Sequence, residues 1–515
     1  MLRFIALLVF ATSTCAQEPA KLPLAEAVKE VLNLPRYQTA HWGLYVVDAK
    51  TGEVLLEHQS RKLFAPASCT KLFSVAAALE SLGPDHRFHT RVVHTGKLDE
   101  EAKALQGDLI LIASGDLTLG GRTLPDGTIA FQNTDHTYAN GSTSGLLTEP
   151  DPLTGLQELA SQVAKKVKKI TGDVIIDDRL FEKAESTGSG PGRITPMLIN
   201  DNLIDFTIIP GEESGKPASV KHRPEGSAIF VDAQVETGNE ASRSTITISA
   251  PSPGRYVVRG SIPARHKPLL RVKEVDDPAS HARSLFIDAL KRAGVAVKAS
   301  SFAGNPAEKL ARSEEVKQLT TVAEFVSPPF SEHARLILKV SHNLHASTLP
   351  LLLAARNQQR NLSQGLHQEA EALKRLGVPM EGISFGGGAG GARADHASPY
   401  AAVMLLKQMA SRPEGEVYRK ALPIVGVDGT PATAVGKESA ARGKFQAKTG
   451  TLSWTNGLTD NSVMTSKALA GYGVTARGRP VLFAFFVNNV LVGEDGTQQA
   501  GRDLGRLCEI VHAME

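Results

Sequence analysis

Between about Phe88 and Ser300 the chain changes in character. Short β-like runs alternate there with loops rich in Gly, Pro and Ser, such as STGSGPG and APSPG. A hairpin pattern and a helix pattern precede this stretch, and helical periodicity returns from about Glu332. At 515 residues the chain is too long for one ordinary core, since domains average roughly 150 residues. We therefore predict an α+β multidomain protein in which β-rich modules interrupt a mixed domain.

The segments around the interruption predict definite elements. His41 to Glu57 predicts a β-hairpin, and the stretch from Ala65 predicts a helix that ends at Gly83-Pro84. Near the other end, the apolar run Val481 to Val487 predicts a buried strand, followed by a helix from Gln498. Within the interruption, the β-like runs are Leu109 to Ile112, Val174 to Ile176, Thr245 to Ile248 and Tyr256 to Val258.

The N-terminus has the pattern of a secretory signal peptide. Arg3 precedes the apolar stretch Phe4 to Thr12, and small residues at Thr14 and Ala16 favour cleavage after Ala16. No other segment reaches about 18 unbroken apolar residues, so we expect no transmembrane segment after signal removal. Cys15 raises a lipoprotein alternative, which the threonines before it fit poorly.

The net charge bears on the possible partners, and the cysteine content bears on possible disulfide bonds. A formal net charge of +3 and the lack of a long basic run give no indication of a nucleic-acid partner. Of the three cysteines, Cys15 would leave with the signal peptide. Cys69 and Cys508 could pair in an oxidising compartment, but two small buried apolar side chains are the favoured interpretation.

The first motif that carries chemistry is Ser68-Cys-Thr-Lys71. At i and i+3 of a helix the two side chains share a face, with Cβ atoms about 5–6 Å apart. Lys71 is the only charge between Lys62 and Glu80, and burial in so apolar a helix would lower its pKa. A neutral amine beside a hydroxyl can act as its general base. Alone the pattern is weak, because a helix cap followed by a solvated Lys has the same letters.

Two further triplets follow along the chain. Ser341-His-Asn343 closes a predicted helix, which its Ser and Asn could simply terminate. Lys448-Thr449-Gly450 lies in an alternating segment that predicts a strand. In this order the three motifs match the Ser-x-x-Lys, Ser-Asp-Asn and Lys-Thr-Gly set of penicillin-binding proteins and serine β-lactamases. His342 replaces the middle Asp of that set.

The tetrapeptide AKTG occurs twice, at Ala49 to Gly52 and at Ala447 to Gly450. The first copy lies between the two β-like runs of the predicted hairpin. Asp48, Lys50 and Gly52 suit a tight turn, in which Gly can take positive φ. We therefore predict a structural turn for the first copy and chemistry for the second.

With these motifs the chain resembles the low-molecular-mass class C penicillin-binding proteins, the D-alanyl-D-alanine carboxypeptidase/endopeptidase family of serine peptidases. The blocks that carry the resemblance are PASCTKLFSVAAAL, GDLILIASGDLTLGG, ITGDVIIDDRLF, NLIDFTIIPG and LPIVGVDGT. The long gap between Ser68 and Ser341 is similar to that of the family, which has two nested inserted domains. β-Lactamases place these motifs much closer.

The resemblance implies a fold and a division of the chain. A signal peptide would occupy 1–16, and a β-lactamase/transpeptidase-like domain, an antiparallel sheet flanked by helices, would be made of 17–87 and 301–515. The β-rich inserted domains, nested one in the other, would occupy 88–300.

The resemblance also implies a mechanism. Ser68 would form an acyl-enzyme at the peptide bond between two D-alanines, with Lys71 taking its proton and Ser341 relaying a proton to the leaving amine. No metal or organic cofactor is implied. The expected substrate contacts are Asn343 to the substrate amide, Lys448 and Thr449 of the strand that contains Gly450 to the terminal carboxylate, and the backbone N–H groups of Ser68 and Thr451 as the oxyanion hole.

Three positions leave questions of substrate preference open. GGAGGAR, from Gly387 to Arg393, stands where the family usually has Asp-Gly-Ser-Gly-Leu-Ser-Arg, so only Arg393 is retained as an expected contact. The segment 454–467 is an addition of roughly ten residues that could be a lid, a partner-facing loop or a neutral surface insertion. Asp177 falls where members carry an acidic contact to the stem peptide, and is equally well a turn carboxylate.

The implied partners are peptidoglycan stem peptides, with D-Ala-D-Ala and cross-link bonds as substrates, and β-lactam antibiotics as covalent inhibitors. The implied location is outside the cytoplasm, periplasmic or extracellular, with loose membrane association and oligomeric state left open. Two alternatives use the same motifs. One is a serine β-lactamase or esterase, and the other is a catalytically weak cell-wall-binding protein.

Overall fold

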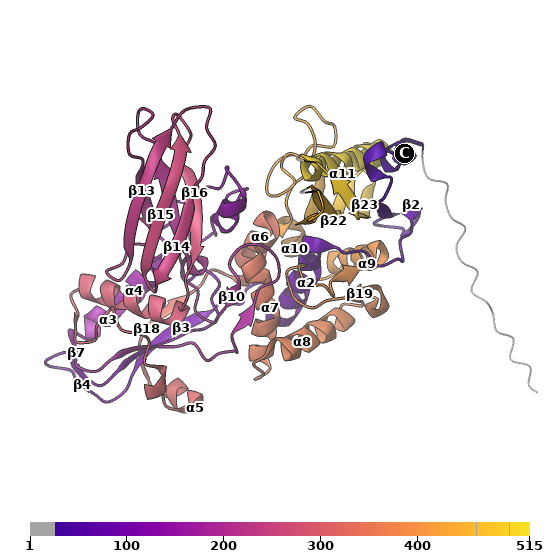
Figure 1. The fold of residues 1–515 in the computed structure, drawn as a ribbon. Helices are drawn as coiled ribbons and strands as arrows, with labels where there is room; N and C mark the ends of the chain where they lie inside the picture. Colours follow the sequence, from indigo (N-terminus) through magenta and orange to yellow (C-terminus); the bar gives the residue numbers. More distant parts are fainter. Residues whose placement is uncertain (1–25, 460, 494, 515) are drawn as a thin grey trace, which may run out of the picture.

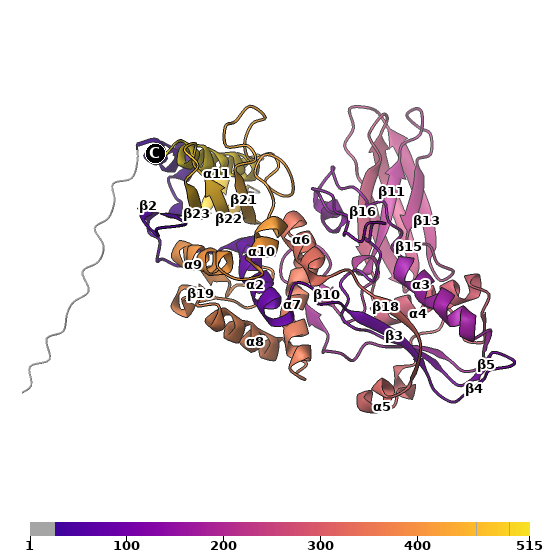
Figure 2. The same ribbon diagram turned by 180° about the vertical axis from the view of Figure 1, so that it is seen from behind.

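The computed structural model describes residues 26–459, 461–493 and 495–514, and the signal peptide predicted for 1–16 lies outside these ranges. Figure 1 shows an elongated molecule with two lobes, a mixed lobe that holds both ends of the described chain and an inserted lobe. Figure 2 shows the same two lobes from behind. Within the described ranges, no helix combines the length and the apolar character needed to span a bilayer.

The mixed lobe is built on an antiparallel sheet with the strand order β2-β1-β23-β22-β21, and β24 pairs with β22. The bounds are β1 (His41–Asp48), β2 (Val54–His58), β21 (Phe445–Thr455), β22 (Ser462–Val474), β23 (Pro480–Asn488) and β24 (Val490–Val492). The predicted hairpin and the predicted buried strand are both confirmed. β23 is apolar from Pro480 to Val487 because Phe483 and Phe485 pack in one core, and Leu482 and Phe486 pack in the core on the other face.

Helices cover both faces of this sheet. α1 and α11 pack on one face, and α9 packs on the other, against a cluster of helices around α2. The bounds are α1 (Glu26–Leu32), α2 (Thr70–Leu82), α6 (Phe330–Val340), α7 (Asn343–Arg356), α8 (Leu362–Arg375), α9 (Pro399–Ala410), α10 (Gly415–Ala421) and α11 (Gly496–Ala513). The helix predicted from Ala65 begins only at Thr70, because Ala67–Cys69 forms the 3₁₀ turn η2 and Ala67 has a φ of +46°. Cys69 and Cys508 are free and buried, as the composition favoured.

The inserted lobe contains a second sheet with the order β18-β3-β6-β8. The helices α3 (Thr154–Lys166) and α4 (Pro278–Arg292) pack against it. The bounds of the strands of this lobe outside the nested module are β3 (His89–His94), β4 (Lys97–Asp99), β5 (Ala104–Gln106), β6 (Leu109–Ile112), β7 (Lys169–Ile170), β8 (Val174–Asp177), β9 (Ala184–Glu185), β10 (Arg193–Ile194), β17 (Ala296–Val297) and β18 (Thr320–Val326).

A β-rich module is nested within this lobe, and Figure 1 shows its long strands projecting away from α3 and α4. Its strands form the sheets β12-β11-β16 and β13-β15-β14 around a shared core. The bounds are β11 (Leu203–Ile209), β12 (Ser219–Arg223), β13 (Phe230–Gly238), β14 (Thr247–Ser252), β15 (Arg255–Pro263) and β16 (Leu269–Glu274). The nested β-rich insertion is therefore as predicted.

Three features of the inserted lobe were not predicted, namely the helices α3 and α4 and the pairing of β18. The helix α3 has buried Leu156, Leu159, Ala160 and Val163 at the i, i+3, i+4, i+7 spacing, a helical signal that the interpretation as short β-like runs passed over. β18 lies beyond residue 300 and pairs with β3 of the insertion. The division at 17–87, 88–300 and 301–515 stays a prediction, and this pairing supports a return to the mixed lobe just before α6.

Candidate active site

Ser68 and Lys71 meet at the junction of η2 and α2. The Lys71 Nζ atom is 2.9 Å from Ser68 Oγ, and it also contacts Asn343 Oδ1 at 2.6 Å and the Ala389 carbonyl oxygen at 2.7 Å. Lys71 is fully buried, and burial lowers its pKa well below the ordinary value, with the charge of Lys448 lowering it further. A neutral Lys71 amine has two hydrogens, which match the acceptors on Asn343 and Ala389, and one lone pair, which matches the Ser68 hydroxyl as a donor.

Ser341 and Asn343 lie at the break between α6 and α7. Ser341 ends α6 in the left-handed region, with a φ of 64°, and Asn343 begins α7. Lys448 on β21 donates to Ser341 Oγ at 2.8 Å and to the Thr449 carbonyl oxygen at 2.8 Å. Burial lowers the pKa of Lys448 to about 7. Each of the two hydroxyls predicted to be catalytic therefore has a buried lysine amine within hydrogen-bond distance.

The strand β21 lies against the turn that carries Ser68. A Cβ atom on Gly450 would be 2.3 Å from the Pro66 carbonyl oxygen, so only glycine lets the two backbones approach this closely. The Cys69 thiol donates to the Lys448 carbonyl oxygen at 3.3 Å across the same junction. The strand predicted for Lys448-Thr449-Gly450 is confirmed, and its glycine has a steric role.

A cavity of about 380 Å³ opens over Ser68. Thr451, Asn343 and Trp454 line it, together with backbone of the loops at 188–189 and 389–391. Thr451, predicted to contribute an oxyanion-hole N–H, therefore lies in the same cavity as Ser68. Thr449 lines a neighbouring cavity instead, and its Oγ1 is 2.6 Å from Thr430 Oγ1.

Two predicted substrate contacts lie apart from the lining of the Ser68 cavity. Asp177 pairs with Arg179 at 2.8 Å and lines a different cavity of about 480 Å³, next to Gln359 and Arg360. Arg393 is exposed at the end of the glycine-rich loop. A role for either residue in substrate binding stays a prediction.

The glycine-rich loop contributes backbone to the site, which no motif of side chains could reveal. Gly390 has a φ of +92°, and a Cβ there would lie 1.9 Å from the Ala67 carbonyl oxygen. This close packing brings the Ala389 carbonyl to Lys71. Asp395 fixes the loop by accepting from the N–H groups of Gly386 at 2.8 Å and Ala392 at 2.7 Å. The density of glycines in GGAGGAR was the sequence signal for such an approach.

The additional segment 454–467 continues β21 and β22 beyond the cavity. Trp454 pairs with Val463 and Thr455 pairs with Ser462, while β24 covers the outer edge of β22. Trp454 is 57% exposed although it lines the Ser68 cavity. The segment therefore begins as an extension of the sheet with an aromatic ring at the mouth of the site.

Comparisons with known proteins agree with this geometry. Residues 24–507 match the D-Ala-D-Ala carboxypeptidase 3 (S13) family. The chain is 29% identical over 461 residues to a D-alanyl-D-alanine carboxypeptidase of Actinomadura sp. (strain R39), covering 84% of this chain and 77% of that relative. It is 24% identical over 473 residues to the D-alanyl-D-alanine carboxypeptidase DacB of Haemophilus influenzae, covering 88% and 86%.

The fold is that of a solved relative. The crystal structure of penicillin binding protein 4 (dacB) from Haemophilus influenzae superposes with a TM-score of 0.69 at 20% identity, covering 94% of this chain and 99% of that one. The same protein complexed with a novel β-lactam superposes with a TM-score of 0.67 at 21% identity, covering 93% and 98%. Because the family match spans nearly the whole described chain, the chain belongs to the D-Ala-D-Ala carboxypeptidase 3 (S13) family and is a serine D,D-peptidase of the low-molecular-mass class C penicillin-binding proteins.

Proposed function

We propose that this peptidase cleaves D-Ala-D-Ala bonds of peptidoglycan stem peptides through an acyl-enzyme on Ser68. The observation that carries the proposal is the buried Lys71 amine, 2.9 Å from Ser68 Oγ, with its other hydrogen-bonding capacity already used. Lys71 takes the Ser68 proton as Oγ attacks the carbonyl carbon of the penultimate D-alanine. The C–N bond breaks, the terminal D-alanine leaves, and water then hydrolyses the ester.

The other motif residues fit the remaining steps. Ser341 Oγ, held by Lys448 at 2.8 Å, relays a proton to the leaving amine, and the Lys448 charge attracts the terminal carboxylate. Asn343 orients Lys71 and binds the substrate amide. The N–H groups of Ser68 and Thr451 stabilise the oxyanion, each donor contributing about 3–4 kcal/mol. Thr449 would bind the carboxylate only after its hydroxyl turns away from Thr430.

Separate observations support the inhibitor class, the cleavage of cross-links and the location of the protein. A relative of the same fold has been solved with a β-lactam, which supports covalent inhibition by that class. Cleavage of cross-links, with Asp177 or Arg393 as stem-peptide contacts, rests on the family pattern. The signal-peptide pattern supports export to the periplasm or the exterior.

The proposal is tested with labelled benzylpenicillin and a stem peptide that ends in D-Ala-D-Ala. We expect a mass shift on the peptide that contains Ser68, and release of D-alanine. Ser68→Ala should lose both, while Ser81→Ala, at the far end of α2, should retain both. An unlabelled wild-type protein would refute the proposal, rapid turnover of the penicillin adduct would indicate a β-lactamase, and stem-peptide binding without D-alanine release would indicate a binding protein.

A further inference from the structure

A cluster of buried charged and imidazole side chains lies beneath the Ser341-His-Asn343 motif. Its members, almost all contributed by the inserted lobe and α7, are Arg122, Asp135, His136, Asp201, Asp205, His342 and His345. Arg122 pairs with Asp135 at 2.6 Å and with Asp201 at 2.7 Å. Buried charges are costly unless they are paired in this way, so a cluster of this size needs a reason.

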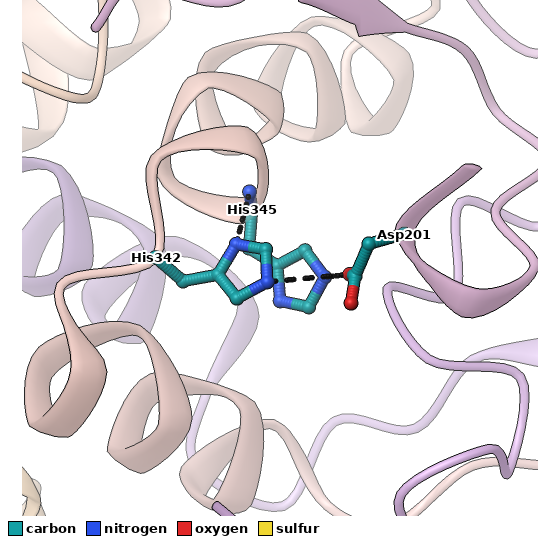
Figure 3. A group of neighbouring side chains, drawn as sticks. All are labelled: Asp201, His342 and His345. Carbon is teal, nitrogen blue, oxygen red and sulfur yellow. Dashed lines mark hydrogen bonds and ion pairs between the residues drawn. The ribbon is translucent and has the colours of Figure 1, made fainter. Parts of the chain in front are cut away.

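Asp201 connects this cluster to the catalytic motif. Figure 3 shows the rings of His342 and His345 one behind the other, both directed at the Asp201 carboxylate. Asp201 Oδ1 is 2.6 Å from His345 Nε2 and 3.2 Å from His342 Nε2. The two rings stack with centroids 3.6 Å apart, and His342 Nδ1 accepts from the His345 N–H at 3.3 Å, which caps the start of α7.

The inserted lobe contacts all three residues of the motif. The Tyr138 hydroxyl donates to the Ser341 carbonyl oxygen, and Asn343 Nδ2 donates to the Ser189 carbonyl oxygen at 2.8 Å. Asp201 reaches the middle residue, His342, through His345, because it bonds His345 Nε2 at 2.6 Å and the His345 ring stacks on that of His342. His342 Nε2 itself lies 3.2 Å from Asp201 Oδ1 without a hydrogen bond. Ser341 needs such support because its left-handed backbone, with a φ of 64°, is unfavourable for a residue with a side chain.

The backbone that carries Asp201 is unusual in the same way. Asn200, Asp201 and Asn202 have φ values of 51°, 55° and 56°, a left-handed run that Asn and Asp tolerate better than other side chains. Asn200 Nδ2 supports the run by donating to the Leu203 carbonyl oxygen at 2.9 Å. Strained backbone of this kind persists only where the surrounding structure fixes it. The Asp201 carboxylate is therefore held in place by its own backbone as well as by the two imidazoles.

The spacing of Asp201, His342 and His345 could also suggest a metal site, since their ligand atoms lie within 4.8 Å of one another. The geometry argues against it. The rings are nearly parallel, 13° apart, so their nitrogen lone pairs run side by side instead of converging on a point about 2.0–2.1 Å from each. Asp201 Oδ2 is also occupied by Arg122 at 2.7 Å and His136 at 2.8 Å.

We propose that Asp201 is a positioning residue for acylation, which holds the His342–His345 pair and thereby sets where Ser341 and Asn343 stand. Asn343 Oδ1 orients the Lys71 amine at 2.6 Å, and Ser341 Oγ is held by Lys448 at 2.8 Å. A shift of the α6–α7 junction would therefore misplace both the base and the proton relay. The inserted lobe thus acts on the chemistry through this junction.

The test compares Asp201→Asn with Asp205→Asn, two buried carboxylates of the same cluster. Asp205 contacts His136 at 2.6 Å, Arg223 at 3.1 Å and Asn200 Nδ2 at 2.9 Å, and none of these is part of the catalytic motif. The Asn side chain at 205 keeps an oxygen that can accept from Asn200, so the backbone that carries Asp201 retains this support. Stopped-flow acylation by benzylpenicillin separates the binding constant from the acylation rate constant. We expect Asp201→Asn to lower the rate constant roughly 10- to 100-fold, as small misplacements do, with binding changed less than about threefold. Asp205→Asn should leave the rate constant within about threefold of wild type.

A folded Asp201→Asn protein with the wild-type rate constant would overturn the proposal, and so would an equal loss in Asp205→Asn. If Asp201→Asn does not fold, His345→Leu and His345→Gln decide the matter. Leu removes the donor to Asp201 and should slow acylation, while Gln keeps a donor near Nε2 and should restore most of the rate. Equal rates in these two variants would refute the proposal.

The proposal rests on acylation of Ser68, so the two must be separable. Wild-type protein that takes no penicillin would refute the proposed function. The interaction between Asp201 and His345 would then be measured by the melting temperatures of Asp201→Asn, His345→Leu and the double variant. We expect the two losses to be non-additive because the residues are in direct contact, and additive losses would refute this interaction.

Discussion

The two copies of AKTG are the same four letters in two different physical settings. In the first, Lys50 is exposed in the turn between β1 and β2, where Asp48 Oδ1 accepts from the N–H groups of Lys50 and Thr51 at 2.7 Å each. In the second, Lys448 is fully buried on β21 and bonded to Ser341. A lysine gains chemistry here from burial and partners, and the four letters AKTG do not by themselves distinguish the two copies.

The glycines of the two copies differ as much as the lysines. Gly52 has a φ of +77° and is needed for its backbone conformation, since a Cβ atom there would meet only the Lys407 amine, at 3.4 Å. Gly450 lies in a regular strand and is needed because the Pro66 carbonyl is so close. Gly52 is needed for the conformation of a turn, and Gly450 is needed for the close approach of two elements. Substituting the two glycines should therefore affect different measured properties.

The largest difference between the two copies is expected when their lysines are replaced. Lys448→Ala should reduce the rate of Ser68 acylation by about 100- to 1,000-fold, because it removes the charge for the carboxylate and the partner of Ser341. Lys50→Ala should leave the rate within about twofold, since an exposed turn residue has no such contact. Stopped-flow acylation of both variants measures this. Comparable losses in the two would show that the assignment of the copies is wrong.

The glycines give the next largest difference. Gly450→Ala should slow acylation by roughly 10- to 100-fold, because the methyl group forces β21 away from the turn that carries Ser68. Gly52→Ala should leave acylation unchanged and lower the free energy of unfolding by about 1 kcal/mol, from the positive φ alone. Denaturant titration beside the acylation assay separates the two effects. A fast Gly450→Ala enzyme would mean that this junction is not rigid.

Acylation should also depend on pH in a way that only the second copy explains. The rate rises as Lys71 loses its proton, because an ammonium cannot accept the proton of Ser68. It should then fall about tenfold between pH 6 and pH 8, because burial lowers the pKa of Lys448 to about 7 and deprotonation removes the charge that attracts the carboxylate. The second-order rate constant for benzylpenicillin measures both limbs. Lys50→Ala should reproduce the wild-type profile. A wild-type rate constant that does not fall between pH 6 and pH 8 would refute the role of the Lys448 charge.

The smallest effect is expected at the first turn itself. Asp48→Ala removes the acceptor of two backbone N–H groups and should lower the free energy of unfolding by about 1–2 kcal/mol, with acylation within about twofold of wild type. Thermal unfolding with a parallel acylation assay measures this. Loss of acylation in a folded Asp48→Ala protein would connect the first copy to the site after all.

Sequence could predict the motifs because their chemistry lies in side chains at fixed local spacing. Ser68 and Lys71 are three residues apart, and Lys448 lies on an alternating strand, so both placements followed from short-range rules. The Ala389 carbonyl could not be found in this way, since every residue has a carbonyl and only the fold selects one. Asp201 was missed for another reason. Its partners at positions 342 and 345 are distant in the chain, and single-sequence patterns carry no information about such contacts.

In the fold, too, local elements could be predicted from the sequence and long-range pairings could not. Short apolar runs predicted β6 and β8 closely, whereas the nested arrangement came only from resemblance to a family. The pairing of β18 with β3 could not be predicted, because it joins segments more than 200 residues apart across the whole insertion.

The burial of Lys71 has a consequence for the order in which this enzyme acquires its activity. Ser68 and Lys71, the proposed nucleophile and base, lie early in the chain. The groups that contact the Lys71 amine, Asn343 and Ala389, lie more than 270 residues later. Before those segments fold, Lys71 is solvated and remains an ammonium, which cannot activate Ser68. A chain that lacks those later segments therefore cannot activate Ser68 through Lys71. Peptidase activity through Lys71 therefore requires the long-range contacts of the assembled molecule.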